Sequence, residues 1–310
     1  MIEAPFHQGE LDAQRLAGRG PGGTSIRDFM PDQHRSFYEL LHFMVAGVLD
    51  QDGWPHATLL TGSPGFVTSP DPRTLHIAGG PDPLDPAAPG FAPGSQVGLL
   101  GIDLGTRRRN RANGRITSAD GGKLVVAIHQ SFGNCPQYIQ TRDVSVVEAT
   151  PRPAEPIAGI DAGARALIEA ADTFFIATSS GPGAGEQGGV DASHRGGRPG
   201  FVHVDGQTLT IPDFKGNRYY NTLGNLLQEP RTGLLFVDFA SGDLLCLQGT
   251  AEVLWDAGAA RMFPGAELLW RVRVVRGWRR PGALPQRWAF REFAPTTERT
   301  GTWSGLDVRP

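Results

Sequence analysis

The segment from Ile211 to Leu226 has the residue types best suited to binding a charged ligand. It follows an apolar run that is typical of a strand. It then contains two closely spaced cations and ends in residues with the periodicity of a helix. Backbone N–H groups at the start of a helix, flanked by cations, form a site suited to an anion such as phosphate. The residues expected at this site are Asp213, Lys215, Asn217, Arg218 and Asn221. A solvated helix start with incidental charges is the alternative interpretation.

Two further groups of polar residues have types that suit the same ligand. Ser193 and Arg195 add a hydroxyl and a cation upstream of the strand-to-helix segment. A dense cluster of cations lies in residues 107–115, and its candidate ligand-binding members are Arg108, Arg109 and Arg111. This cluster suits an anionic substrate or a phosphate reaching across from the other half of the chain. A solvated turn between strands, where charges deter strand pairing, explains it equally well.

Residues 131–140 offer amide, aromatic and thiol groups, which are carried by Asn134, Gln137, Gln140, Tyr138 and Cys135. The amides are suited to pairing with the edge of a ring. Cys135 and Tyr138 are the candidate catalytic residues. A place in the core is the alternative for Cys135, because free cysteines commonly behave as small apolar residues, and a reactive thiol needs nearby cations.

Common hydrolase and metal-binding patterns are missing from the sequence. It contains no GxSxG, HExxH or Walker A motif, and its eight histidines and two cysteines show no ligand spacing. We therefore expect neither a hydrolase nor a structural metal site.

The elements that must position these residues recur along the chain. Gly62-Ser63-Pro64-Gly65-Phe66-Val67 is matched by Gly197-Arg198-Pro199-Gly200-Phe201-Val202, and the pairs Gly98/Gly233 and Gly114/Gly249 have the same spacing of 135 residues. A period of this length is the size of a small domain. We predict a first domain at 31–150, a proline-rich linker at 151–160 and a second domain at 161–310. Residues 1–30, which are polar and rich in glycine, are predicted to form an irregular arm.

Both predicted domains consist mainly of β-strands with a few helices. Short apolar runs are bounded by turn residues, as in Phe43–Leu49 and Pro55–Thr61, which flank a turn containing Asp52-Gly53. Helices are expected near 31–41, 161–171 and 218–227. Many short strands with few helices predict a barrel in each half. The proline-rich residues 81–94 are predicted to form a loop.

The composition limits the class of protein. The net charge of −3 gives no sign of a nucleic-acid-binding surface. No apolar stretch reaches the roughly 20 residues of a membrane helix, and the first residues do not resemble a signal peptide. Two isolated cysteines fit a reducing compartment. We therefore expect a cytoplasmic protein that binds neither nucleic acid nor a membrane.

With these features, the second half resembles the FMN-binding split β-barrel proteins of the pyridoxamine 5′-phosphate oxidase-like superfamily. The resemblance is carried by Gly200-Phe201-Val202, by residues 213–225 and by residues 231–238. The first half is similar to the other copy seen in tandem members of the family, including residues 131–140. Together the two resemblances cover about residues 30–295.

The resemblance implies two tandem split β-barrels with one FMN between them. Its phosphate and ribityl contacts would be Ser193, Arg195, Asp213, Lys215, Asn217, Arg218 and Asn221, with Asn134 and Gln137 available to the ring and Arg108, Arg109 and Arg111 to the substrate. The proline-rich loop at 81–94 has no cation. We therefore expect one flavin per chain rather than two.

The function that the resemblance implies is an FMN-dependent oxidoreductase acting on a small molecule. The candidate electron donors are a partner reductase and a nicotinamide, and the chain is expected to be a monomer or a homodimer. The alternatives are a non-catalytic flavin- or haem-binding module and a deazaflavin-dependent reductase on the same fold. Neither the substrate nor the direction of the redox reaction follows from the sequence, because one fold hosts many activities.

Overall fold

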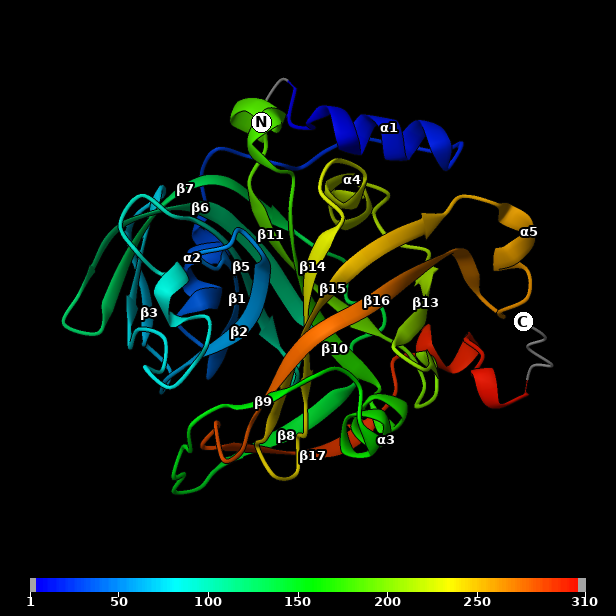
Figure 1. The fold of residues 1–310 in the computed structure, drawn as a ribbon. Helices are drawn as coiled ribbons and strands as arrows, with labels where there is room; N and C mark the ends of the chain where they lie inside the picture. The colour runs from blue at the N-terminus through cyan, green and yellow to red at the C-terminus, as the bar shows by residue number, and fades with distance from the viewer. Residues whose placement is uncertain (1–3, 306–310) are drawn as a thin grey trace.

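Two large antiparallel β-sheets make up most of the computed structural model, which describes residues 4–305 (Figure 1). The first sheet has the strand order β2-β1-β5-β6-β7-β4-β3 and consists of β1 (Phe43–Leu49), β2 (Pro55–Thr61), β3 (Val67–Asp71), β4 (Thr74–Ala78), β5 (Gln96–Asp103), β6 (Arg108–Asp120) and β7 (Lys123–Gly133). The second has the order β11-β10-β14-β15-β16-β13-β12 and consists of β10 (Thr173–Ser179), β11 (Val190–Gly196), β12 (His203–Asp205), β13 (Thr208–Phe214), β14 (Arg231–Val237), β15 (Leu244–Leu254) and β16 (Ala266–Arg280).

The strand order of the second sheet is that of the first with every strand number raised by nine. The glycines shared by the two halves have matching roles. A Cβ atom at position 98 would lie 2.6 Å from the Cα atom of Asp191, and one at position 233 would collide with the backbone of Pro55 and His56. Gly98 therefore lets β11 approach closely, and Gly233 does the same for β2. These two strands have equivalent places in the two halves, so the interface is nearly symmetric.

Helices lie at the margins of the sheets. They are α1 (Gln8–Leu16), α2 (Asp32–Tyr38), α3 (Ala162–Ala170), α4 (Asn221–Gln228) and α5 (Ala257–Ala260), with short 3-10 turns at Ala88–Gly90, Pro182–Gln187, Thr297–Arg299 and Trp303–Gly305. Asp161 caps α3, because its Oδ1 accepts a hydrogen bond from Ala164 N at 2.9 Å. No helix of residues 4–305 is long and apolar enough to cross a membrane.

The hydrophobic core has three main parts. Each sheet covers a cluster of its own, and a third cluster lies between the sheets. Phe43 and Leu100 of the first half belong to this third cluster, together with Phe175 and Leu235 of the second. All four side chains are buried, and burying one of this size contributes about 1.5–3 kcal/mol. The two halves are thus joined by a continuous apolar interface.

The predicted arm and linker both contain regular secondary structure. The arm at 1–30 is not irregular throughout, because α1 forms there and packs against α4 (Figure 1). The linker at 151–160 contains β9 (Glu155–Ile157), which pairs with β16. In addition, β8 (Thr141–Val146) pairs with β17 (Gln286–Glu292), so a strand near the end of the chain is attached to the first half. Residues 1–3 of the expected arm and 306–310 of the expected second domain lie outside the described residues.

Candidate functional site

A cavity of about 870 Å³, including its open mouth, lies where the two halves meet. Its walls come from β6, the segment after β7, β11, β13 and the loop that leads into α4. The predicted site residues that line it are Arg109, Arg111, Asn134, Cys135, Gln137, Tyr138, Ser193, Arg195, Asp213, Asn217, Arg218 and Asn221. Three predicted residues, Lys215, Arg108 and Gln140, lie elsewhere. Lys215 is exposed outside the lining, and the guanidinium of Arg108 stacks over Phe37 at 4.6 Å.

Of the arginines in residues 107–111, Arg107 lies in the predicted turn and the others do not. Arg108 begins strand β6, which crosses the sheet between β5 and β7. Alternation along this strand brings Arg109 and Arg111 to the cavity and leaves Arg108 exposed. The solvated-edge interpretation is therefore wrong for Arg111, which is only 8% exposed.

The loop between β13 and α4 is held in an unusual backbone conformation. Arg218 and Tyr220 have φ values of 61° and 60°, in the left-handed region that residues other than glycine seldom adopt. Such residues cost about 1–3 kcal/mol each and persist where the surroundings fix them. In the described chain the other non-glycine residues of this kind are Arg107 and Tyr138. Three of the four line the cavity, so backbone strain is concentrated there.

The N-terminus of α4 opens toward the cavity. Tyr220 occupies the N-cap position, and no side chain accepts a hydrogen bond from the first turn. Asn221, Thr222 and Leu223 of that turn line the cavity, and the hydroxyls of Thr222 and Ser193 share a hydrogen bond of 2.9 Å. Free N–H groups and the helix dipole make this end of the helix favourable for an anion.

Three arginines surround the start of α4, and each is anchored by acceptors. Arg111 donates to both carboxylate oxygens of Asp191 at 2.9 and 2.8 Å and to the hydroxyl of Ser193. Arg195 pairs with Asp213, and Arg218 lies 3.4 Å from a carboxylate oxygen of Glu267.

Each of these guanidinium groups keeps one donor free. The Nε atoms of Arg111, Arg195 and Arg218 are buried and have no hydrogen-bond partner among the described residues. A buried donor without a partner costs about 1–3 kcal/mol. With Arg109, the lining contains four arginines against the carboxylates of Asp213 and Glu267. The cavity therefore has an excess of positive charge and donors that an anionic ligand would satisfy.

The first half contributes a second arginine environment, centred on Arg109. Its Nε donates to the backbone oxygen of Cys135 at 3.0 Å, and its Nη1 lies 3.1 Å from Nδ1 of His194. Burial lowers the pKa of Arg109 to about 10, so the side chain stays charged at neutral pH. Nη2 lies 3.9 Å from the thiol of Cys135, which is half-buried at the cavity wall.

His194 is a site residue that sequence reasoning missed. Burial, followed by the nearby arginines, lowers the pKa of His194 well below its usual value, so the ring is neutral. Since Nδ1 faces a guanidinium, it must be the acceptor, and we infer that the proton is on Nε2. Nε2 is buried and has no partner in residues 4–305. The only signal in the sequence was its place between Ser193 and Arg195.

The segment after β7 supplies an aromatic wall. The Tyr138 ring stacks on Phe214 of the second half, with ring centroids 5.0 Å apart, and burial raises the pKa of Tyr138 to about 12, so its hydroxyl stays protonated. Asn134 has a buried Oδ1 atom with no partner among the described residues. Gln140, by contrast, is wrongly predicted as a ring contact. Its amide bonds to Tyr138 O at 3.2 Å and accepts from Ala294 N at 3.0 Å, outside the cavity lining.

The corresponding place in the first half is closed by its own side chains. Thr58 stands 135 residues before Ser193, and its hydroxyl donates to Asp85 of the proline-rich loop. Arg280 donates to Asp85 at 2.7 Å and to Asp82 at 2.6 Å. Carboxylates of the chain itself thus meet the hydroxyl and the cation at this position, although the Nε atom of Arg280, like those of Arg111, Arg195 and Arg218, is buried without a partner.

The arrangement suits a ligand that carries an anionic group and a ring. The second half supplies two arginines, hydroxyls, a helix start and a neutral histidine, and the first half supplies two arginines, amides and an aromatic ring. No group of three or more histidine, cysteine, aspartate or glutamate side chains in residues 4–305 is arranged to hold a metal ion.

The comparison with protein families found a match in the half that contains α4. Residues 160–279 match the family model described as pyridoxamine 5′-phosphate oxidase. This half belongs to the pyridoxamine 5′-phosphate oxidase-like split-barrel family. The matched region runs from just before α3 to the end of β16 and includes every second-half residue of the predicted site. The first half lies outside the match.

Several solved structures resemble part of the chain. A HupZ variant from Group A Streptococcus is 16% identical, with a TM-score of 0.30, and the match covers 39% of this chain and 98% of that one. A Clostridium acetobutylicum protein related to general stress protein 26 is 14% identical, with a TM-score of 0.31 and coverage of 42% and 92%. A FAD-binding protein from Mesorhizobium loti is 12% identical, with a TM-score of 0.29 and coverage of 41% and 97%. No curated protein matches the chain.

Proposed function

We propose that this protein is an FMN-dependent oxidoreductase acting on a small molecule, with one flavin bound between its two halves. The observation that carries the proposal is that three arginines with unpartnered Nε atoms line the same cavity as the uncapped N-terminus of α4. The flavin would supply hydride or electron exchange, and the chain would bind and orient it. The family of residues 160–279 supports a flavin as the ligand.

The residues present fit a flavin phosphate. Arg111, Arg195 and Arg218 would each donate through a free Nε atom, and Ser193 and Thr222 would add hydroxyls. Hydrogen bonds to a charged group contribute about 1.5–3 kcal/mol each. A phosphate would therefore form hydrogen bonds with donors that otherwise carry a desolvation cost. The ion pairs of these arginines would hold the donors in place for it.

The residues of the first half, together with His194 of β11, fit the ring. Asn134 and His194 have a buried acceptor and a buried donor without partners, and Gln137 and Tyr138 line the same wall. Arg109 is the candidate for an anionic substrate, and Cys135 and Tyr138 stay the candidate catalytic residues. We further propose that the first half is a second split barrel, since it repeats the strand order of the family domain. A single chain would then form the interface by itself.

The spectrum and mass of the ligand that co-purifies with the protein test the proposal. Flavin absorption bands and the mass of FMN are expected. A Soret band would identify haem instead, and a deazaflavin would be recognised by its own spectrum and mass. Either result, or a protein that takes up no FMN, would overturn the cofactor assignment. Turnover of a small-molecule substrate by the loaded protein, with oxygen or a nicotinamide, separates an enzyme from a flavin-binding module.

Paired variants test the site itself. Arg195→Ala together with Arg218→Ala is expected to weaken FMN binding by at least a hundredfold, because two charge-assisted hydrogen bonds are lost. Lys215→Ala is the matched control, since this cation is in the same segment but outside the cavity. Equal loss in the control and the double variant would show that the anion site is misplaced.

A further inference from the structure

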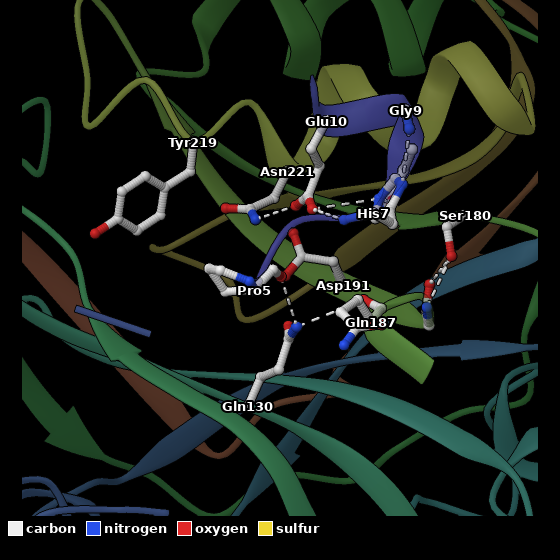
Figure 2. A network of polar contacts seen from close by, with 12 residues as sticks. Pro5, His7, Gly9, Glu10, Gln130, Ser180, Gln187, Asp191, Tyr219 and Asn221 are labelled. Atoms are coloured by element: carbon white, nitrogen blue, oxygen red, sulfur yellow. Dashed lines mark hydrogen bonds and ion pairs between the residues drawn. The ribbon is translucent and has the colours of Figure 1, made fainter. Parts of the chain in front are cut away.

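The N-terminal segment (residues 5–27) lies against the outside of the anion loop (residues 215–221), which leads into α4. Figure 2 shows Glu10 and His7 of this segment beside Asn221 and Asp191. The contact is between parts of the chain about 200 residues apart, and α1 lies alongside α4 (Figure 1). The predicted arm is thus joined to the element that carries the candidate phosphate site.

Glu10 is connected to a cavity arginine through one side chain. Its carboxyl group accepts a hydrogen bond from Asn221 Nδ2 and another from the backbone N of His7 at 3.0 Å. The amide oxygen of Asn221 accepts from Nη1 of Arg111 at 3.2 Å. Asn221 is the first residue of α4, so Glu10 fixes a side chain at the helix start that faces the expected phosphate.

Two more contacts hold the anion loop from the same side. Arg19 lies 2.7 Å from Glu267, the carboxylate that also pairs with Arg218. The hydroxyl of Tyr219 accepts a hydrogen bond from Ser25 N at 3.0 Å. Tyr219 stands between Arg218 and Tyr220, the two left-handed residues of the loop. The segment therefore contacts the strained part of the loop directly.

The packing of α1 on α4 depends on two glycines. A Cβ atom at position 224 would lie 2.6 Å from the Cα atom of Glu10, and one at position 9 would collide with the backbone oxygen of Gly224. Next to them, Nε2 of His7 lies 2.8 Å from Oδ1 of Asn225. Gly224 and Asn225 of the predicted strand-to-helix segment thus serve the N-terminal segment rather than the cavity.

We propose that the N-terminal segment is a positioning element of the flavin site, holding the anion loop in its phosphate-binding conformation through Glu10 and Arg19. A conformation with two left-handed residues requires contacts that fix it from outside, and in the described structure this segment supplies them. The inference rests on the proposed function, because the ligand of the loop is the flavin phosphate. Glu10 is a positioning residue and does not itself line the main cavity.

The test compares the binding of FMN and of riboflavin, which lacks the phosphate, to the full-length apoprotein. Glu10→Ala is expected to weaken FMN binding by about two- to tenfold, the effect of one hydrogen bond between neutral groups, and to leave riboflavin binding unchanged. Glu10→Gln should restore most of the affinity because its amide oxygen can still accept from Asn221. Asp12→Asn, on the same helix and away from the loop, is the matched control.

Gly224→Ala provides an independent variant. Alanine favours the helix of α4 by about 1 kcal/mol, while its Cβ displaces α1, so a fold with unchanged thermal stability and weaker FMN binding is expected. If the wild type binds FMN and both Glu10→Ala and Gly224→Ala bind it equally well, the positioning role is overturned and the proposed function stands. Equal weakening of FMN and riboflavin also overturns it. If the wild type binds no FMN, both proposals fail.

Discussion

Arg280 of β16 and Asp85 of the proline-rich loop form a buried ion pair, with Nη1 and Oδ2 2.7 Å apart and their side chains 3% and 1% exposed. Thr58 donates to the same carboxylate. This cluster lies at the position in the first half that corresponds to Ser193 and its arginines in the second. The sequence showed only that the loop lacks cations. The structure shows that its Asp85 carboxylate pairs with Arg280, a cation of the second half.

Asp85→Ala is expected to lower the free energy of unfolding by about 3–5 kcal/mol, because it leaves the guanidinium of Arg280 buried without its main partner. Chemical denaturation monitored by tryptophan fluorescence measures the change. Asp82→Ala is the matched control, since its carboxylate pairs with the same arginine but its side chain is 27% exposed, and it should cost about 1 kcal/mol or less. Equal losses in the two variants would contradict the assignment of Asp85 as the buried counterion.

Gly98→Ala is expected to destabilise the protein by about 1–3 kcal/mol, the range for overpacking a close contact. The new Cβ would lie 2.6 Å from the Cα atom of Asp191 and would push the two halves apart. Because Asp191 holds Arg111, FMN binding should weaken as well. Gly183→Ala has open space around its Cβ and serves as the control. An unchanged unfolding midpoint in Gly98→Ala would show that the halves are less closely packed there.

Local signals in the sequence predicted local structure well. Strands β1 and β2 have the predicted boundaries, because the Asp52-Gly53 turn and the apolar runs beside it suffice to define a hairpin. Helix α1 escaped prediction because its stability depends on a distant partner. Its buried residues are Gly9, Glu10 and Ala13, which do not form an apolar face that periodicity could detect.

Most residues of the cavity were identified by type, but their environment depends on long-range contacts. The sequence left a solvated cluster and a ligand site equally open for Arg109 and Arg111, because their partners, His194 and Asp191, are about 80 residues away. Lys215 and Arg218 looked alike in the sequence. The left-handed turn at Arg218 directs one of them to the cavity and leaves the other exposed, and no pattern in the sequence predicts such a turn at an arginine.

Glu10 should make stability depend on pH. Burial, as the largest cause, raises the pKa of Glu10 from 4.5 to about 8. Between these values the folded protein keeps a proton that the unfolded chain has lost. The stabilisation is therefore complete below about pH 4.5, is lost as the pH rises toward 8, and changes no further above it. The charged groups around Glu10 are Asp191 of β11, which raises its pKa further, and Arg111 of β6, which opposes the rise.

The measurement compares the unfolding free energy of wild type and Glu10→Gln from about pH 6.5 to 9. Burial also lowers the pKa of the neighbouring His7 from its usual value, but both proteins contain this histidine, so its contribution cancels in the comparison. Wild type is expected to lose about 1–2 kcal/mol relative to Glu10→Gln between pH 6.5 and 8, at up to about 1.4 kcal/mol per pH unit. If the difference in unfolding free energy between the two proteins stays constant over this range, Glu10 is ionised in the folded state. Asn221 would then be held by a charged rather than a neutral carboxyl group.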